Sequence, residues 1–403
     1  MADSLHHGWP PDAKMAAMSD DARTDDAPLL PILLATAAIS CGVGLIFPLL
    51  AEFQDRYGFS AAGLGLISAS TFISALVAGV GLAQLADRGR ARALLVVGLV
   101  GTACSLVWFS FATELWQFVG ARAVEGLAAG IFVPAARKVV TAGDPLQAGR
   151  RLGMLTSAEL AGFLMGPVIG AALSGITLQT PFILVASICL VFVVVAVRVR
   201  LPRLEESDRT RSSLSSVAML RRPRVAGAAL LSLALFLPVG VYDAMWSRYL
   251  TDRGASTLLI GAGLSLYAVP VILLATWGGR LADRYGAVRV ATIALCFVIP
   301  MTVGYGLLTV PLLITALAFA EGVPQAVANP AVQAAMLDAC AGDEVAAGQG
   351  LAYAVNQVGA GVSALVAPIV YAATGPETLF VAVGALMAVV FAGGALLSRR
   401  AVP

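Results

Sequence analysis

Long apolar stretches separated by short polar segments follow one another along almost the whole chain from residue 29. A helix needs roughly 20 apolar residues to cross the hydrocarbon core of a bilayer, and most of these stretches reach that length. The pattern predicts twelve transmembrane helices, at residues 29–50, 62–86, 93–112, 115–137, 152–175, 180–198, 225–248, 258–281, 290–309, 312–336, 346–371 and 378–398. Membrane β-strands would instead show apolar–polar alternation over segments of about ten residues. We therefore predict an all-α membrane protein.

Polar segments divide these predicted helices into two groups of six. Residues 1–28 form a polar segment that we expect to be a disordered N-terminal tail. It shows no basic region followed by a cleavage site, so we expect no signal peptide. Residues 199–224 are rich in Arg, Ser, Glu and Pro and form either a solvated linker or a contact site for anionic lipids. The predicted bundles are 29–198 and 225–398, followed by a short tail at 399–403.

Basic residues are concentrated in alternate loops. The loops after the second, fourth, sixth and eighth predicted helices carry most of them: Arg88, Arg90, Arg92, Lys138, Arg150, Arg151, Arg200, Arg203, Arg209, Arg211, Arg221, Arg222, Arg224, Arg284 and Arg289. The opposite loops hold only Arg56, Arg248 and Arg253. Positively charged loops stay on the cytoplasmic side of a membrane. We therefore expect a multi-pass protein of the inner or plasma membrane with both termini in the cytoplasm.

The composition agrees with a membrane location and excludes several functions. The chain is 59% hydrophobic and 12% charged, about half the charged share of a soluble domain, which is about 25%. A net charge of +2 provides no broad basic surface for nucleic acid. The five cysteines lie far apart and both histidines, His6 and His7, lie in the N-terminal tail, so we expect no metal site. The sequence has no phosphate-binding loop motif and no nucleophile–base pair, so we expect no cofactor and no enzyme.

The two groups of helices are related by an internal repeat. The segment Leu-Ala-Asp-Arg occurs at 85–88 and again at 281–284, an offset of 196 residues. The same offset relates Gly58 to Gly254, Gly65 to Gly261, Glu125-Gly126 to Glu321-Gly322, and Pro134 to Pro330. Two parallel repeats of six helices, with a site between them, are typical of one class of secondary transporters.

Two six-helix bundles with an Asp-Arg loop after the second and eighth helices resemble the major facilitator superfamily over residues 29–398. The family signature is Gly-x-Leu-Ala-Asp-Arg-x-Gly-Arg-basic. Its second copy matches at Gly279, Asp283, Arg284, Gly286 and Arg289, with Ala287 in place of a basic residue. The first copy matches at Asp87, Arg88, Gly89 and Arg90, with Ala83 in place of the leading glycine and one residue missing before Gly89. The resemblance implies that these loops hold a cytoplasmic gate shut through charge contacts.

The predicted fifth helix carries a second family motif. Gly162, Gly166, Pro167 and Gly170 resemble the motif Gly-x-x-x-Gly-Pro-x-x-Gly-Gly of the antiporter branch, with Ala171 in place of the last glycine. This resemblance favours efflux over uptake. The three glycines also lie on one helix face, which permits close approach of another helix. Proline frees one backbone carbonyl and can kink the helix.

Four acids in the predicted helices are candidates for carrying protons: Glu125, Glu159, Asp243 and Glu321. A charge inside the membrane is costly, so each acid needs a partner, a proton or a wet cavity. Glu125 and Glu321 are our first choice because the repeat relates them. Arg122 lies on the same face as Glu125 and begins a segment that resembles the family's Arg-x-x-x-Gly motif, often tied to proton coupling. Arg122 and Glu125 form either a structural ion pair or a proton-exchanging pair. We expect Asp243 to pair with Arg248, and Glu159 to pair with Arg122.

Polar residues of the later helices are candidates for lining a substrate cavity. The resemblance implies that helices 1, 4, 7 and 10 surround the central cavity. Glu321, Gln325, Asn329 and Gln333 recur every four residues and form one polar stripe on the tenth helix. The other candidates are Tyr242, Trp246, Tyr353, Asn356 and Gln357. The alternative for each is a hydrogen bond that only holds helices together.

These observations predict a secondary active transporter that exports a small amphipathic compound, a drug or a metabolite, in exchange for protons by alternating access. Its partners would be this substrate, protons and the lipid bilayer. An excess of acids over bases favours cationic or neutral cargo. The alternatives are a proton-coupled uptake symporter, a facilitative uniporter, and a non-transporting receptor or scaffold, which would not need intramembrane acids. Twelve helices are enough for a monomeric transporter, and the sequence leaves the oligomeric state open.

Overall fold

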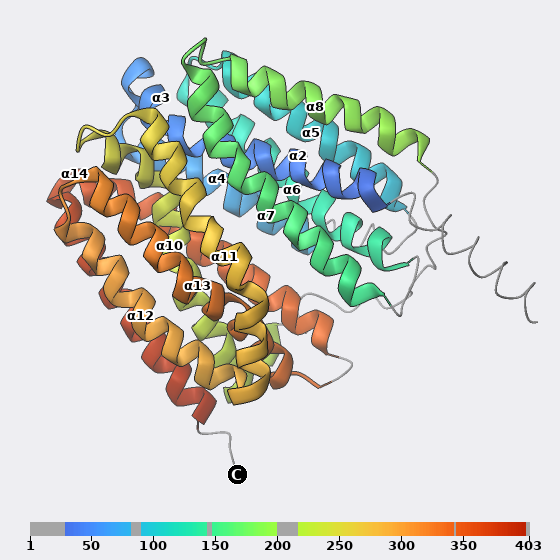
Figure 1. Cartoon of the computed structure of the whole chain (residues 1–403), viewed down its shortest axis with the longest axis vertical. Helices are drawn as coiled ribbons and strands as arrows, with labels where there is room; N and C mark the ends of the chain where they lie inside the picture. Colours follow the sequence, from blue (N-terminus) through green and yellow to red (C-terminus); the bar gives the residue numbers. More distant parts are fainter. Residues whose placement is uncertain (1–28, 82–89, 143–146, 200–216, 342–343, 400–403) are drawn as a thin grey trace, which may run out of the picture.

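The computed structural model describes residues 29–81, 90–142, 147–199, 217–341 and 344–399, and the statements that follow concern these residues (Figure 1). Within them, eleven helices are long and apolar enough to cross a membrane. The predicted N-terminal tail and most of the predicted linker lie outside the described residues, and the domain boundaries stay predictions.

The first half contains six spans. The first span is made of α2 (Leu29–Leu45), the short 3-10 helix η1 (Phe47–Leu49) and α3 (Leu50–Tyr57). The others are α4 (Ala61–Gly81), α5 (Ala91–Phe111), α6 (Leu115–Ala142), α7 (Ala148–Ser174) and α8 (Thr180–Arg198). The first span continues beyond the predicted end at residue 50 as far as Gly58, whose φ of 69° ends the helix. Glycine adopts such a positive φ at no steric cost.

The second half begins with the short 3-10 helix η3 (Met219–Arg221). It continues with α10 (Pro223–Thr251), α11 (Thr257–Tyr285), α12 (Ala287–Leu307), α13 (Pro311–Ala339) and α14 (Val345–Arg399). Helix α10 begins two residues before the predicted start at 225, with Pro223 in its first turn, a position at which the missing N–H has no cost.

Helix α14 contains the last two predicted spans. Its 55 residues are interrupted at Gly375, whose φ of 84° and ψ of 175° are not helical. Pro376 follows, and proline is well suited to begin the next helical segment. The two segments on either side of Gly375 correspond to the predicted helices 346–371 and 378–398.

The helices pair in the same way in both halves. In the first half α4 packs against α6 and α5 against α8, and in the second half α11 packs against α13 and α12 against α14. The halves meet where α4 contacts α14 and where α7 contacts α11. A pair of repeat-related glycines marks these two contacts, because a Cβ at Gly65 would lie 2.7 Å from the Leu365 carbonyl oxygen, and one at Gly261 would lie 2.5 Å from that of Pro167.

The two ends of the molecule differ in charge. We call the end at which α2 and α10 begin the basic end, because its connections carry Arg90, Arg150, Arg221, Arg284 and Arg289. We call the other end, where α3 and α10 finish, the distal end. In Figure 1 the two halves adjoin at the distal end, near α3, and their helices diverge toward the basic end.

Candidate functional site

An ion cluster lies inside the molecule where the two halves meet. Arg122 and Glu125 both project from α6, and their Nη1 and Oε2 atoms are 2.5 Å apart. The second guanidinium nitrogen of Arg122 lies 3.2 Å from the Asp243 carboxylate on α10, in the other half. All three side chains are buried. Arg122 and Glu125 lie on one face of the helix, and the expected ion pair between them is present. Asp243 adds a second carboxylate to Arg122 from the other half.

This cluster has more acid than base. One guanidinium cannot neutralise two carboxylates, so the cluster carries one net negative charge when both acids are ionised. A buried uncompensated charge is strongly unfavourable. Glu125 Oε1 also has no hydrogen-bond partner among the described residues. Binding one proton at either acid would remove the excess charge.

Glu321 on α13 lies in a second, uncharged environment. Tyr305 on α12 donates a hydrogen bond of 2.5 Å to its carboxylate, and Tyr242 on α10 donates at 3.2 Å. Gln325, one turn along α13, donates at 3.4 Å. The side chain is fully buried, and within the described residues no cation forms an ion pair with it. Neutral donors stabilise a carboxylate but leave its negative charge in place.

Helix α10 connects the two carboxylate sites. Tyr242 contacts Glu321, whereas the next residue, Asp243, contacts Arg122 in the other half. Trp246, one turn further, packs edge-on against Tyr242 and Tyr305 with ring centroids 5.6 and 5.3 Å away. The two acid sites are therefore joined by adjacent residues of a single helix.

Two expected ion pairs are wrong. Asp243 does not pair with Arg248, because its buried carboxylate faces Arg122, whereas Arg248 extends to the distal end. Glu159 does not pair with Arg122, whose guanidinium is engaged by other acids. Glu159 instead lies 3.8 Å from Arg137 of α6, and both of these side chains are partly exposed.

The predicted polar stripe on α13 is present as two hydrogen-bonded pairs. Gln325 donates to Glu321, and Gln333 donates to Asn329 at 2.8 Å. Exposure increases along the stripe toward the basic end, from fully buried Glu321 to exposed Gln333. This gradient is compatible with a polar path from the basic end to Glu321.

The candidates on α14 connect helices. Asn356 accepts a 2.8 Å hydrogen bond from Ser232 of α10, and the Tyr353 hydroxyl lies 3.5 Å from the Ala75 carbonyl of α4, in the other half. Gln357 is half-buried. The first two contacts agree with the alternative in which such residues hold helices together.

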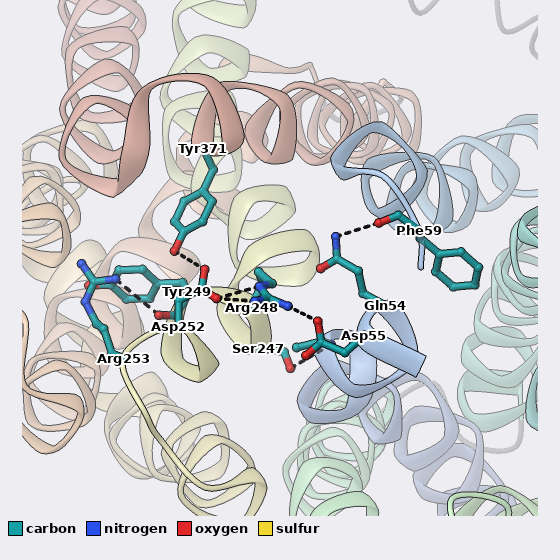
Figure 2. Close-up of polar contacts among 10 residues, drawn as sticks. Gln54, Asp55, Phe59, Ser247, Arg248, Tyr249, Asp252, Arg253 and Tyr371 are labelled. Atoms are coloured by element: carbon teal, nitrogen blue, oxygen red, sulfur yellow. Dashed lines mark hydrogen bonds and ion pairs between the residues drawn. The ribbon is translucent and has the colours of Figure 1, made fainter. Parts of the chain in front are cut away.

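A polar network at the distal end joins the halves and was not predicted from the sequence (Figure 2). Arg248 of α10 binds Asp55 of α3 in the first half, and also Asp252 one turn along its own helix at 2.5 Å. Asp252 accepts a 2.8 Å hydrogen bond from Tyr371 of α14. Ser247 donates to the Pro48 carbonyl across the interface at 2.8 Å. The network therefore fastens α3 to α10 at this end.

Comparison with known proteins identifies the family. The sequence model of the Major Facilitator Superfamily matches residues 32–247 and, as a second copy, residues 228–403. The chain belongs to the Major Facilitator Superfamily. The predicted all-α fold of two repeated halves is therefore confirmed, and this superfamily member is a multi-pass membrane transporter and not an enzyme.

Several relatives of this superfamily member are named. Multidrug resistance protein MdtG of Rahnella sp. (strain Y9602) is 25% identical over 344 residues, which cover 82% of this chain and 82% of that relative. MdtG of Klebsiella pneumoniae (strain 342) is 26% identical over 298 residues, or 71% and 72% of the two chains.

Solved structures have the same fold. A bacterial homologue of the human lysosomal transporter Spinster, in an inward-facing and unoccupied conformation, superposes with a TM-score of 0.79 at 14% identity, over 93% of this chain and 97% of that chain. The nucleoside transporter NupG gives a TM-score of 0.76 at 15% identity, over 92% and 98%. At these identities the comparison establishes the fold alone.

The family motif of the fifth helix packs α7 tightly against α2 in this superfamily member. A Cβ added at Gly162, Gly166 or Gly170 would lie 2.1, 2.5 or 2.5 Å from a backbone oxygen of α2. On the same helix Leu164 accepts a 2.5 Å hydrogen bond from Ser265 of α11 in the other half. The expected close approach is present, and the segment around Pro167 lies where α2, α7 and α11 meet.

The loop signature is described only in part. Asp87, Arg88 and Gly89 lie outside the described residues, whereas Arg90 is exposed at the start of α5. In the second copy Gly279 belongs to α11, and Gly286, with a φ of 91°, forms the turn between α11 and α12. Asp283, Arg284 and Arg289 are exposed, and none of them forms an ion pair with another described residue. The gating role of this loop stays a prediction.

Replacing Asp55 with asparagine is expected to favour opening of the distal end about twofold and at most about fivefold, because partly exposed ion pairs contribute about 0.2–1 kcal/mol. Arg248 would keep Asp252 and would not be left unpaired. Spin labels at Arg56 and Leu258, both exposed at this end, would report the opening as a shift in the measured distance distribution. Glu52→Gln is the control, because Glu52 is an exposed acid of α3 that forms no ion pair with any described residue of the other half. Equal distributions for Asp55→Asn and the control would contradict a role for the network in closing this end.

Proposed function

We propose that this transporter exports a small amphipathic compound in exchange for protons by alternating access. Three observations support the proposal: the similarity to multidrug resistance proteins over most of the chain, the antiporter-type segment on α7, and the two repeat-related acids buried in the interior. We further propose that the basic end faces the cytoplasm, which places both termini there.

The observation that carries this proposal is the environment of Glu321. Its carboxylate is buried among two tyrosine hydroxyls and one glutamine amide, all of them uncharged donors. An ionised Glu321 therefore needs a positive charge from outside the protein, which is either a proton or a cationic substrate. If the proton and the substrate compete for this carboxylate, binding of one displaces the other. A carrier that binds the proton and the substrate alternately then exchanges one for the other.

The surroundings of Glu321 also indicate a class of substrate. Tyr242 and Tyr305 lie beside the carboxylate, and the Trp246 ring packs edge-on against both tyrosines. Aromatic faces attract organic cations, most strongly where water is excluded. At the two acid sites three carboxylates, those of Glu125, Asp243 and Glu321, lie with one guanidinium, that of Arg122. This arrangement favours lipophilic cations and neutral amphipathic compounds over anions.

The arrangement of the halves suggests how the cycle proceeds. The distal network fastens the two halves at one end, and the polar stripe of α13 becomes more exposed toward the other. We propose that the structure represents the state that receives substrate from the basic end. Release at the distal end would then require the contact between Asp55 and Arg248 to open.

The test is a pH trace in inside-out vesicles that contain the protein and an imposed proton gradient. Lipophilic cations and neutral compounds are added in turn, and at least one is expected to dissipate the gradient. Glu321→Gln is expected to slow this response at least tenfold, because the amide retains the size of the side chain but carries no exchangeable proton. Glu52→Gln is the matched control, since Glu52 is an exposed acid of α3 and is not one of the candidate proton carriers, and we expect it to respond as the unchanged protein does.

Other outcomes identify the alternatives. Proton-coupled uptake requires the compound to accumulate in right-side-out vesicles as protons enter with it. A uniporter equilibrates labelled compound equally in the unchanged protein and in Glu321→Gln. If Glu321→Gln retains full substrate-dependent proton movement, Glu321 does not carry the exchanged proton and the proposal fails.

A further inference from the structure

Four buried side-chain oxygens around the Arg122 cluster have no hydrogen-bond partner among the described residues. Two of them, Glu125 Oε1 and Asp243 Oδ2, are the second oxygens of the carboxylates that contact Arg122. The other two are the hydroxyl oxygens of Ser68 and Thr71 on α4. All four side chains are more than nine-tenths buried. Buried polar atoms are normally paired with protein, water or an ion, so these four oxygens together indicate a ligand.

Helix packing brings the four oxygens to one place between the halves. Ser68 lies beside the Asp243 carboxylate of the other half. Thr71 is three residues further along α4 and therefore on the same face of that helix. Its carbonyl packs against Gly126, the residue after Glu125, where an added Cβ would lie 2.2 Å from the Thr71 oxygen. Helices α4, α6 and α10 thus contribute oxygens to a single site.

The internal repeat shows that the fold does not require the two hydroxyls of α4. In the second half the Tyr267 carbonyl packs against Gly322 in the same way, with an added Cβ 2.4 Å from the oxygen. This shared contact shows that the residues at an offset of 196 are equivalent in the structure. Leu264 occupies the position of Ser68, and Tyr267 that of Thr71. The two small hydroxyls beside a buried acid are a property of the first half.

The charge of the cluster indicates which ligand suits it. With both acids ionised, one negative charge is left over, because within the described residues only Arg122 forms an ion pair with them. A proton would neutralise this charge but would bind a single carboxylate oxygen. A divalent cation would leave one positive charge. A monovalent cation neutralises the cluster and offers a partner to every one of the four oxygens, which are ligands of the kind that hard cations prefer.

The remaining unpartnered atom of the cluster and the place of the site agree with a bound ion. Arg122 Nε also lacks a hydrogen-bond partner among the described residues, and a water bound to the ion would accept from it. Coupling-ion sites of secondary transporters lie at the interface between the two repeats. Here Asp243 comes from the second half and the other ligands come from the first. An ion bound to both halves favours the state in which α10 lies against α4 and α6.

We propose that the oxygens of Ser68, Thr71, Glu125 and Asp243 form a binding site for one sodium ion. Sodium suits this set better than potassium, because the larger ion takes more oxygen ligands. The site is separate from Glu321, and it does not depend on which compound is exported.

The test measures equilibrium binding of radioactive sodium to the purified full-length transporter, in mildly alkaline buffer with choline chloride to hold the ionic strength constant. The unchanged protein is expected to show saturable binding of one ion per molecule. Ser68→Ala and Thr71→Ala each remove one oxygen without changing any charge, and each is expected to weaken binding about fivefold. Ser110→Ala is the matched control, because Ser110 is a buried serine whose hydroxyl donates to the Val107 carbonyl, and it is expected to change nothing.

Thermal unfolding provides a second measurement. Sodium chloride is expected to raise the unfolding temperature of the unchanged protein by a few degrees relative to choline chloride at equal ionic strength, because a ligand that binds the folded state alone stabilises it. Asp243→Asn is expected to bind no sodium and to lose this shift, since Arg122 and Glu125 then neutralise each other.

Absence of saturable binding, or binding that Ser68→Ala and Asp243→Asn leave unchanged, would overturn the proposal. Glu321→Gln is expected to retain sodium binding, because the hydrogen bonds of Glu321 come from Tyr242, Tyr305 and Gln325. The sodium site and proton exchange at Glu321 can therefore fail separately. A protein that moves protons with its substrate but binds no sodium would overturn this site alone.

Discussion

Replacing Arg122 with glutamine is expected to abolish substrate-driven proton movement and to lower the yield of folded protein strongly. Arg122 is the only cation that contacts Glu125 and Asp243 within the described residues, and all three side chains are buried. Removing one partner of a buried ion pair costs about 3–5 kcal/mol, because the remaining charge stays uncompensated. Loss of the contact with Asp243 also removes a bond between the halves. Heating followed by size-exclusion chromatography would measure the fall in thermal stability.

Neutralising the acids together with the arginine separates folding from transport. A triple variant with Arg122→Gln, Glu125→Gln and Asp243→Asn has no buried charge in this cluster, so thermal stability should return toward that of the unchanged protein. Transport should not return, because the acids are part of the proposed mechanism. Arg122→Lys is expected to be more stable than Arg122→Gln but less stable than the unchanged protein. One ammonium group cannot replace the two guanidinium nitrogens that contact Glu125 and Asp243. If the triple variant is no more stable than Arg122→Gln alone, the uncompensated charge is not the cause of the loss.

Replacing Gly162 with leucine is expected to prevent correct packing of the first half. A Cβ at this position would lie 2.1 Å from the Ala37 carbonyl oxygen, which is closer than any two such atoms approach in real structures. The obstacle is backbone rather than a flexible side chain, so α2 and α7 must separate along their contact. Introducing bulk into a well-packed interface costs about 1–3 kcal/mol or more. The yield of monodisperse protein after purification would report the effect.

The same helix provides the control for this prediction. A Cβ at Gly153, in the exposed part of α7, would meet nothing within 4 Å. Gly153→Leu is therefore expected to leave the yield unchanged or slightly higher, because leucine is a better helix former than glycine by up to about 1 kcal/mol. A similar yield for both variants would mean that the close contact with α2 is not needed for folding.

The sequence predicted the helices and the repeat because both depend on local or periodic information. Long apolar stretches determine where helices cross a membrane, and a constant offset of 196 needs no knowledge of contacts. The exception is the first span, which continues to Tyr57 although Leu50–Tyr57 carries Glu52, Gln54, Asp55 and Arg56. A hydropathy pattern ends at polar residues, whereas a helix continues until its backbone is interrupted, here by Gly58.

The same reason explains which parts of the site could be predicted. Arg122 and Glu125 are three residues apart on one helix, so helical geometry alone joins them. Asp243 is 121 residues from Arg122, and its distance from both Arg122 and Arg248 is set by how the two halves pack. Tyr305 lies in an apolar stretch without charged residues nearby. Its only signal in the sequence was that a buried tyrosine needs a partner for its hydroxyl.

The distal network was missed for a related reason. Arg248 and Asp252 are four residues apart, so their contact could have been predicted from helical spacing. Asp55 and Tyr371 come from distant helices and carry no signal of their own in the sequence.

The imbalance at the two acid sites, where three carboxylates lie with the single guanidinium of Arg122, has an electrical consequence. Moving one elementary charge across a membrane potential of 100 mV changes its free energy by about 2.3 kcal/mol. Outward movement of one monovalent cation against one proton transfers no net charge, so voltage would not influence it. If two of the acids bind protons in each cycle, one positive charge moves inward, and the membrane potential drives export together with the pH gradient. Measuring the initial rate of cation export at different clamped potentials therefore shows how many acids bind a proton in each cycle: a rate independent of voltage indicates one, and a rate that increases with the potential indicates two.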